Sequence, residues 1–118
     1  MADLPTRDAA LLLDMLLAAR DARDFVEGMD QAAFQASRLH QNAVIRSLEV
    51  MGEAAGKVSA ETINALGGID WRRITGMRHR LIHAYSDVSL DTVWVTVRDH
   101  VPPLNASLEA LVPGPDAS

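Results

Sequence analysis

The sequence predicts an all-α protein, a compact bundle of four main helices with a short extra helix. Apolar residues recur at spacings of three and four along most of the chain, which is the period of helices buried on one side. The one segment with strong β-propensity, residues 93–97, has no second strand-like segment to pair with, so we expect it to be helical. With 118 residues, 48% of them hydrophobic, the chain is expected to form a single domain, 1–118, with its core in about residues 6–112.

The first helix is expected to begin after Pro5 and to end at Gly28. Proline fixes φ at a value suited to a first helical turn, and Asp8 places negative charge at the positive end of the helix dipole. Its apolar stripe consists of Leu12, Leu16, Ala19, Ala22 and Val26. Asp30 can then cap a short turn that holds Phe34.

The second long helix is expected from about Ser37 to Lys57, and a short helix follows it. The apolar stripe of the long helix consists of Val44, Leu48, Met51, Ala55 and Val58. Ser59 can cap the short helix, which we expect to extend through Leu66 and to be closed by Gly67–Gly68.

The third and fourth main helices fill the rest of the chain. Asp70 can cap the third, and its inward residues are expected to be Trp71, Ile74, Leu81 and Ile82. The chain restarts at Ser86-Asp87 or Ser89, and the stripe of the fourth helix is Leu90, Val93, Trp94, Val97 and Val101. Pro102–Pro103 should kink or break this helix, because proline loses a backbone hydrogen bond and clashes with the preceding turn. A short stripe of Leu104, Leu108 and Leu111 follows, before a frayed tail at 113–118.

Composition excludes several classes of protein and site. The absence of cysteine excludes disulfides, a thiol nucleophile and cysteine-type zinc sites, and His40 and His100 are isolated, so we expect no metal and no cofactor. A net charge of −5 argues against non-specific coating of nucleic acid. Without a membrane-spanning run or a secretory signal, the protein is expected to act in the cytoplasm, away from membranes.

One stretch, residues 71–86, is rich in basic residues and contains no acid. Within it, Arg78, His83 and Tyr85 lie close together. Cleavage of RNA moves a proton from a ribose 2′-hydroxyl and adds negative charge at phosphorus, tasks suited to a histidine and a guanidinium respectively. The alternative is that these residues are surface cations late in a helix, where they favour the dipole.

A second polar stripe lies on the predicted 37–57 helix. Its members, at spacings of four, three and four, are Asn42, Arg46, Glu49 and Glu53. They share one face of the helix, separate from its apolar stripe. This face is either solvated, with an internal Arg46–Glu49 or Arg46–Glu53 pair, or it is half-buried and lines a polar cleft beside the third helix.

The stretch Gly76–Tyr85 resembles the signature of the HEPN superfamily, in particular its HepT-type toxins. The motif Arg, four residues, His, one residue, Tyr falls on Arg78, His83 and Tyr85. Matching flanks occur in the right order over residues 8–112, namely Arg46–Ala55, Asp70-Trp71-Arg72, Asp91–Trp94 and Pro102–Leu104. His79 departs from the pattern, because the family commonly has Asn directly after the motif Arg.

The resemblance implies an all-α toxin that works as a homodimer and cuts RNA without metal. It also implies a partner, a minimal nucleotidyltransferase (MNT-type) antitoxin that transfers AMP from ATP to Tyr85. The departure at His79 bears on RNA preference and on the pH profile. An alternative function is that of a non-catalytic HEPN module that binds a nucleotide or a protein.

Helix geometry favours the homodimer independently. Arg78 and His83 are five residues apart, so on a straight helix they diverge by roughly 140°. One copy would aim both groups at one phosphate only if the helix ended between them or if Arg78 reached around it. A two-fold axis near this helix would bring two arginines and two histidines into one cleft.

Overall fold

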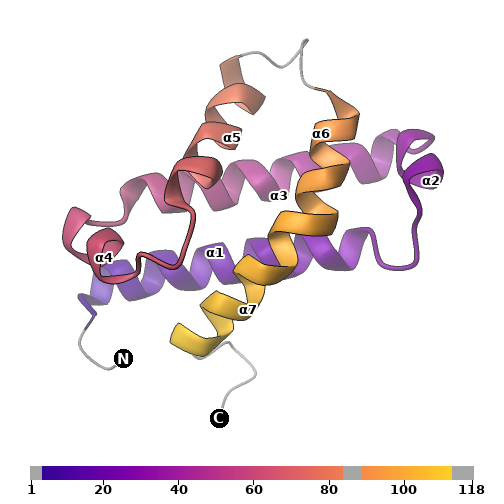
Figure 1. Cartoon of the computed structure of the whole chain (residues 1–118). Helices are drawn as coiled ribbons and strands as arrows, with labels where there is room; N and C mark the ends of the chain where they lie inside the picture. The colour runs from indigo at the N-terminus through magenta and orange to yellow at the C-terminus, as the bar shows by residue number, and fades with distance from the viewer. Residues whose placement is uncertain (1–3, 84–88, 113–118) are drawn as a thin grey trace.

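Two pairs of helices cross each other to form the protein (Figure 1). The structure, a computed structural model, describes residues 4–83 and 89–112, which form helices and no strand. In chain order the elements are α1 (Thr6–Phe25), α2 (Gln31–Gln35), α3 (Arg38–Lys57), α4 (Ala60–Ala65), α5 (Trp71–His83), α6 (Leu90–Val95), the π-helix η2 (Thr96–His100) and α7 (Val101–Leu111).

The long helices α1 and α3 run side by side in opposite directions, and the later helices cross over them (Figure 1). Helix α5 packs on α3, whereas α6, η2 and α7 follow one another as a bent column, here named the C-terminal rod, whose α7 end packs on α1. The short helices α2 and α4 lie at opposite ends of the α1–α3 pair. The predicted all-α bundle is confirmed, with α2 as a second short helix.

Five helix starts that the sequence predicts are confirmed, and N-caps form at all five, those of Asp30, Ser59 and Asp70 as predicted. In each case the side-chain oxygen of the cap accepts a hydrogen bond from the backbone N–H three residues later, at Asp30, Ser37, Ser59, Asp70 and Ser89. Helix α1 ends at Phe25, slightly before the expected stop, and Gly28 follows with a φ of 77°, a left-handed conformation that glycine adopts without strain.

The predicted apolar stripes form the core, with one error on α5. The stripe of α3 is buried throughout, and Phe34 of α2 lies against Trp94 of α6 with ring centroids 5.4 Å apart. Ile82, however, is 41% exposed. The inward side of α5 passes through Leu81, and the next residue lies about 100° around the helix, so Ile82 faces solvent.

Asp8 contributes more than a favourable charge at the start of α1. Its side chain is buried, and its carboxylate accepts hydrogen bonds from the Ser59 hydroxyl at 2.6 Å, the Thr62 hydroxyl at 2.5 Å and the Ser59 N–H at 3.1 Å. These bonds, that from the Ser59 hydroxyl first, hold the pKa of Asp8 below its usual value. The carboxylate thereby ties the start of α1 to the start of α4.

The C-terminal rod is not broken at its prolines: a π-helix precedes them, and the rod is bent. Pro102 and Pro103 lie in the first turn of α7, directly after the π-helix, whose last bond runs from the Val101 N–H to the Thr96 carbonyl. One buried stripe, at every fourth residue, consists of Val93, Val97, Val101 and Asn105. On a regular α-helix, each step of four residues would rotate this stripe by about 40° around the axis. The wider turn supplies an extra residue and keeps this stripe on the core.

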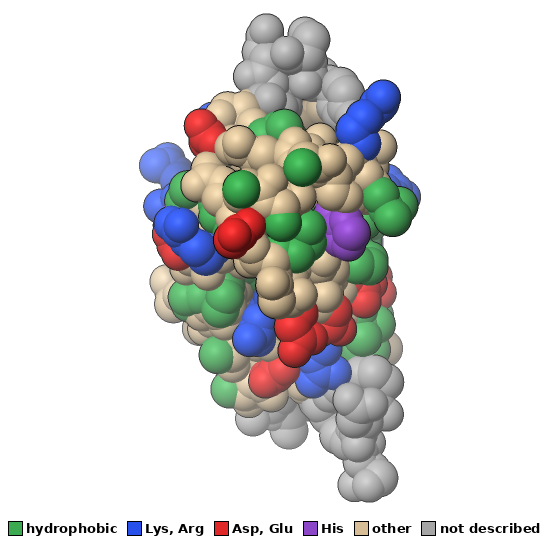
Figure 2. All heavy atoms as spheres, turned by 90° about the vertical axis from the view of Figure 1, so that its right-hand side faces the viewer, with side chains coloured by type: hydrophobic (Ala, Val, Ile, Leu, Met, Phe, Trp, Pro, Cys, Tyr) green, Lys and Arg blue, Asp and Glu red, His purple; other side chains and the backbone are tan. Residues whose placement is uncertain are grey.

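The surface at the α2 end of the molecule carries acidic, basic and apolar side chains, and several acidic ones lie close together in the lower half of the view (Figure 2). In the described residues, no helix has the length and apolarity needed to span a membrane.

Candidate active site

Arg78 occupies a position on the buried side of α5. Trp71, Ile74 and Leu81 form the inward stripe of this helix, and Arg78 falls between the last two at the same helical spacing. Arg78 is half-buried, whereas its neighbours along the stripe, Ile74 and Leu81, are buried. A charged side chain therefore stands where packing alone would favour an apolar one.

Gly52 of α3 makes room for Arg78. A Cβ atom at Gly52 would lie 2.3 Å from the Arg78 Cβ and 3.1 Å from both the Arg78 Cγ and the Ile74 carbonyl oxygen. Only a glycine permits α3 and α5 to cross this closely. The crossing fixes the stem of Arg78 directly against the backbone of α3.

The Nε of Arg78 is buried and has no hydrogen-bond partner among the described residues. A buried donor left unpaired costs about 1–3 kcal/mol, and few such groups persist without a reason. The guanidinium to which this nitrogen belongs is a cation that can pair with an oxyanion, such as a phosphate oxygen.

The rest of the motif lies at the end of α5. The helix runs unbroken through His83, which excludes the possibility that it ends between positions 78 and 83. These positions therefore lie about 140° apart around one helix. His79 is exposed on the same helix. The side chain of His83 and the whole of Tyr85 lie outside the described residues.

The polar stripe on α3 is exposed except at one position. Asn42, Arg46 and Glu53 are exposed, and Glu49 is half-buried. The Glu53 carboxylate pairs with Lys57 at 3.4 Å. In the described part of the chain, Arg46 forms no ion pair with Glu49 or with Glu53. Glu49 lies one helical turn before Gly52, and Glu53 directly follows that glycine. That the four residues line one cleft with Arg78 stays a prediction.

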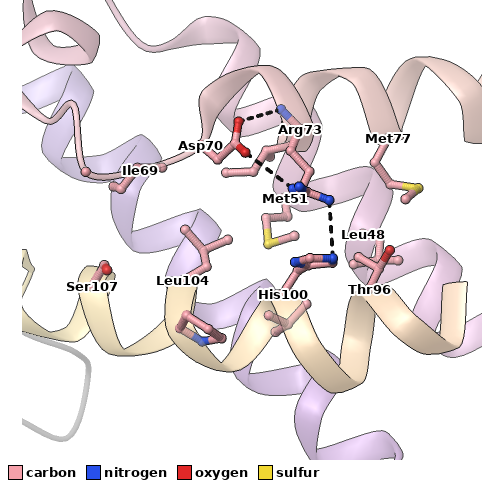
Figure 3. A pocket seen from close by; sticks show the side chains of 14 residues that line it. Leu48, Met51, Ile69, Asp70, Arg73, Met77, Thr96, His100, Leu104 and Ser107 are labelled. Carbon is pink, nitrogen blue, oxygen red and sulfur yellow. Dashed lines mark hydrogen bonds and ion pairs between the residues drawn. The ribbon is translucent and has the colours of Figure 1, made fainter. Parts of the chain in front are cut away.

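A second polar cluster lies where α5 faces the C-terminal rod. Asp70 accepts hydrogen bonds from the Arg73 N–H at 3.1 Å and the Arg73 Nε at 3.3 Å, and Arg73 Nη1 lies 3.2 Å from His100 Nε2 of η2 (Figure 3). Because a guanidinium only donates, His100 Nε2 accepts in this pair. The Arg73 N–H and then its guanidinium hold the pKa of Asp70 below its usual value.

This cluster lines a groove between α5 and the C-terminal rod, here named the α5 groove (Figure 3). The sequence marked Arg73 only as part of a basic stretch and His100 as isolated. No local pattern joins them, because they are 27 residues apart and meet only when η2 packs beside α5. Within the described residues, no group of three or more His, Cys, Asp or Glu side chains could hold a metal ion.

Residues 15–111 match the family model described as Ribonuclease HepT-like. This chain belongs to the HepT-like ribonuclease family. The resemblance of its motif to HepT-type toxins is thereby confirmed at the level of the family.

Among HepT-like relatives, the chain is 34% identical over 110 residues to "Putative RNase MJ0125" of Methanocaldococcus jannaschii, covering 92% of this chain and 95% of the relative. It is 37% identical over 78 residues to "Probable ribonuclease HepT" of Thermococcus cleftensis, covering 66% and 71%. A third relative, "Putative RNase TTE0752" of Caldanaerobacter subterraneus, is 30% identical over 87 residues, 74% and 78% of the two chains. No solved structure matches this chain significantly.

Family membership supports ribonuclease activity and agrees with the helical fold.

Proposed function

We propose that this protein is the toxin of a toxin–antitoxin system, a metal-independent endoribonuclease that acts in the cytoplasm on RNA. Arg78 and His83 are its catalytic residues. The observation that carries the proposal is the buried, unpartnered Nε of Arg78 on the inward stripe of α5, in a chain of the HepT-like ribonuclease family.

The chemistry follows from the two side chains. His83, as general base or acid, moves a proton from the ribose 2′-hydroxyl or to the departing 5′-oxygen. The 2′-oxygen attacks phosphorus, the bond to the 5′-oxygen breaks, and a 2′,3′-cyclic phosphate remains. The Arg78 guanidinium stabilises the extra negative charge at phosphorus as it develops. Because the nucleophile belongs to the substrate, the reaction does not require a metal-bound hydroxide.

A homodimer completes the site in this proposal. Positions 78 and 83 point about 140° apart on one unbroken helix. A two-fold axis close to α5 brings Arg78 of one copy near His83 of the other and repairs this divergence.

The face of α3 beside the crossing is proposed to line the same cleft. Glu49, one helical turn before Gly52, would contribute beside Arg78, and Asn42 and Arg46 would extend the face toward the start of α3. His79 would lie at the exposed edge of the cleft and influence which RNA is preferred. Glu53 is already paired with Lys57, so its contribution is expected to be the smallest.

Control by an MNT-type antitoxin is proposed to act on Tyr85. The phenol, with an ordinary pKa near 10, is a poor proton shuttle at neutral pH compared with a histidine. One AMP attached to its oxygen would bring a phosphate against Arg78 and occupy the place of the RNA phosphate. Inhibition would then need no change of fold.

The test is cleavage of RNA by purified protein in EDTA. Wild type is expected to cut and to leave 2′,3′-cyclic phosphate ends, whereas Arg78→Ala should lose about 10²–10³ in rate, as when one electrostatic donor is removed. Arg23→Ala, an exposed arginine on α1, is the matched control and should cut normally. If wild type binds RNA but does not cut it, the protein is a non-catalytic binding module. Cleavage that Arg78→Ala leaves unchanged would reject the site.

A further inference from the structure

The α5 groove lies between α5 and the C-terminal rod, away from the α3–α5 crossing that holds Arg78, and has no part in the mechanism above. It consists of two adjoining cavities of about 250 and 410 Å³, which share Arg73, Met77, Thr96 and His100 as lining residues. Pockets for drug-sized ligands hold about 300–1,000 Å³. The inner cavity is therefore suited to one ring system and the outer cavity to the group attached to it.

The inner cavity is mainly apolar. Its walls come from α3, α5 and the C-terminal rod and include Leu48, Met51, Ile74, Met77, Val101 and Leu104. Figure 3 shows Met51 and Leu48 behind the gap that Arg73 crosses. Thioethers and aliphatic side chains adapt to a flat ring and contact its face. A nucleobase has this shape, and its polar edge could meet Asp70 or Ser107 at the mouth of the cavity.

The outer cavity is basic. Arg72, Arg73 and Arg80 line it, and the acids nearby are already engaged. Asp70 is bound to Arg73, and the Asp91 carboxylate accepts from the side-chain amides of Gln31 and Gln35 on α2. Among the described residues, Arg72 and Arg80 make no ion pair with an acid. The local charge favours an anion.

The contact between Arg73 and His100 is the point where that anion would sit. Asp70 holds Arg73 from one side, so that Nη1 faces the imidazole at 3.2 Å. An oxyanion is a stronger acceptor for a guanidinium than an imidazole nitrogen is. Once it has replaced His100 as the partner of Arg73, the imidazole can carry its proton on Nε2 and donate to the same oxyanion.

We propose that the α5 groove is a nucleotide subsite, in which the inner cavity takes a nucleobase and Arg73 and His100 hold the adjoining phosphate. The proposed function supplies only the source of this nucleotide, which would be one residue of the bound RNA strand; in that respect the proposal rests on it. Arg73 and Arg78 are about 140° apart around α5. A strand that reaches both must cross the exposed face of α5, where Arg72 lies.

Gly76 offers a way to block the groove without disturbing the core. It lines the outer cavity, and no atom lies within 4 Å of the place where its Cβ would be. A leucine there would extend into the groove, and it is a better helix former than glycine. Gly56 on α3 also has open space at its Cβ position and is outside the groove, so Gly56→Leu is the matched control.

The experiment measures AMP binding by calorimetry to full-length protein carrying Arg78→Ala, which removes the proposed catalytic phosphate site. We expect AMP to bind this protein and to bind at least about tenfold more weakly when Gly76→Leu or Arg73→Ala is added. Gly56→Leu should leave binding unchanged. Circular dichroism and thermal unfolding verify that each variant is folded.

A short 2′-O-methyl RNA, which cannot be cut, then identifies the source of the nucleotide. If this RNA displaces AMP, the groove holds a residue of the strand; if it does not, the groove holds a free nucleotide, and the subsite still stands. Neither result depends on whether the protein cuts RNA. AMP and RNA binding that Gly76→Leu leaves unchanged would overturn the proposal.

Discussion

The α-carbon of Gly52 approaches Arg78 so closely that a Cβ atom at position 52 would lie 2.3 Å from the Arg78 Cβ. The contact joins the middle of α3 to the only charged position on the inward stripe of α5 among the described residues. A residue without a side chain thereby determines where the arginine stands.

Gly52→Ala should destabilise the protein and reduce RNA cleavage together. The added methyl group must push α5 away, at a cost of about 1–3 kcal/mol for overpacking, which exceeds the gain in helix propensity of about 1 kcal/mol. Thermal unfolding and the cleavage rate measure the two effects. Gly56→Ala, with open space around it, should raise the unfolding temperature slightly and leave cleavage unchanged. Equal behaviour of the two variants would contradict the close crossing.

A mixture of Arg78→Ala and His83→Ala proteins should recover activity that neither has alone. If each site takes Arg78 from one copy and His83 from the other, a mixed dimer contains one intact site. Random exchange of subunits would then restore about a quarter of the wild-type rate. The cleavage rate of the mixture, after partial unfolding and refolding to exchange subunits, checks this. No recovery in a protein that light scattering finds to be dimeric would mean that one copy supplies both residues.

Tyr85→Phe should keep RNA cleavage and toxicity but escape the antitoxin. The variant lacks only the oxygen that would accept AMP, and the catalytic groups remain. Mass spectrometry after incubation with the MNT-type partner and ATP should find the added AMP on wild type alone. Normal modification and silencing of the variant would show that another residue carries the control.

The stability of the protein should fall in acid because of Asp8. Its folded-state pKa lies below the ordinary value of 3.8, since the Ser59 hydroxyl, the Thr62 hydroxyl and the Ser59 N–H all bind the ionised form. The stabilisation is therefore fully present above the unfolded pKa and is lost as the pH falls from about 3.8 through the folded pKa.

Thermal unfolding between pH 6 and pH 2 tests this dependence. We expect Asp8→Asn to be less stable than wild type at pH 6 and to lose less of its stability on acidification. Asp14→Asn, an exposed acid on the same helix, should follow the wild-type curve. An Asp8→Asn curve parallel to that of wild type would show that this carboxylate does not carry the acid sensitivity.

The sequence predicts what local chemistry decides. Caps such as Asp30 and Ser59 act on an N–H three residues away, so the helix starts could be predicted without the fold. The exposure of Ile82 could not be predicted in this way, because it depends on which side of α5 meets α3. The π-helix before Pro102 could not be predicted either, because it depends on how a whole stripe of residues packs on the core. The sequence shows only the prolines that follow it.

The candidate site also has parts that the sequence predicts and parts that depend on the fold. Arg78 is found from its motif, but its burial and its contact with Gly52 depend on the crossing of two helices. Arg73 and His100 carry no shared pattern, since 27 residues separate them. The side chains of His83 and Tyr85 lie outside the described residues, so their roles rest on the motif.

The packing of α7 on α1 has a consequence for how the protein is made. Arg20 of α1 and Glu109 of α7 are joined at 3.3 Å across 89 residues of chain, and Leu108 is fully buried beside them. On the ribosome, the face of α1 that α7 covers stays open to water until residues 101–111 have been synthesised. A protein with this order of assembly completes its fold only after the ribosome has read past the codons for α7.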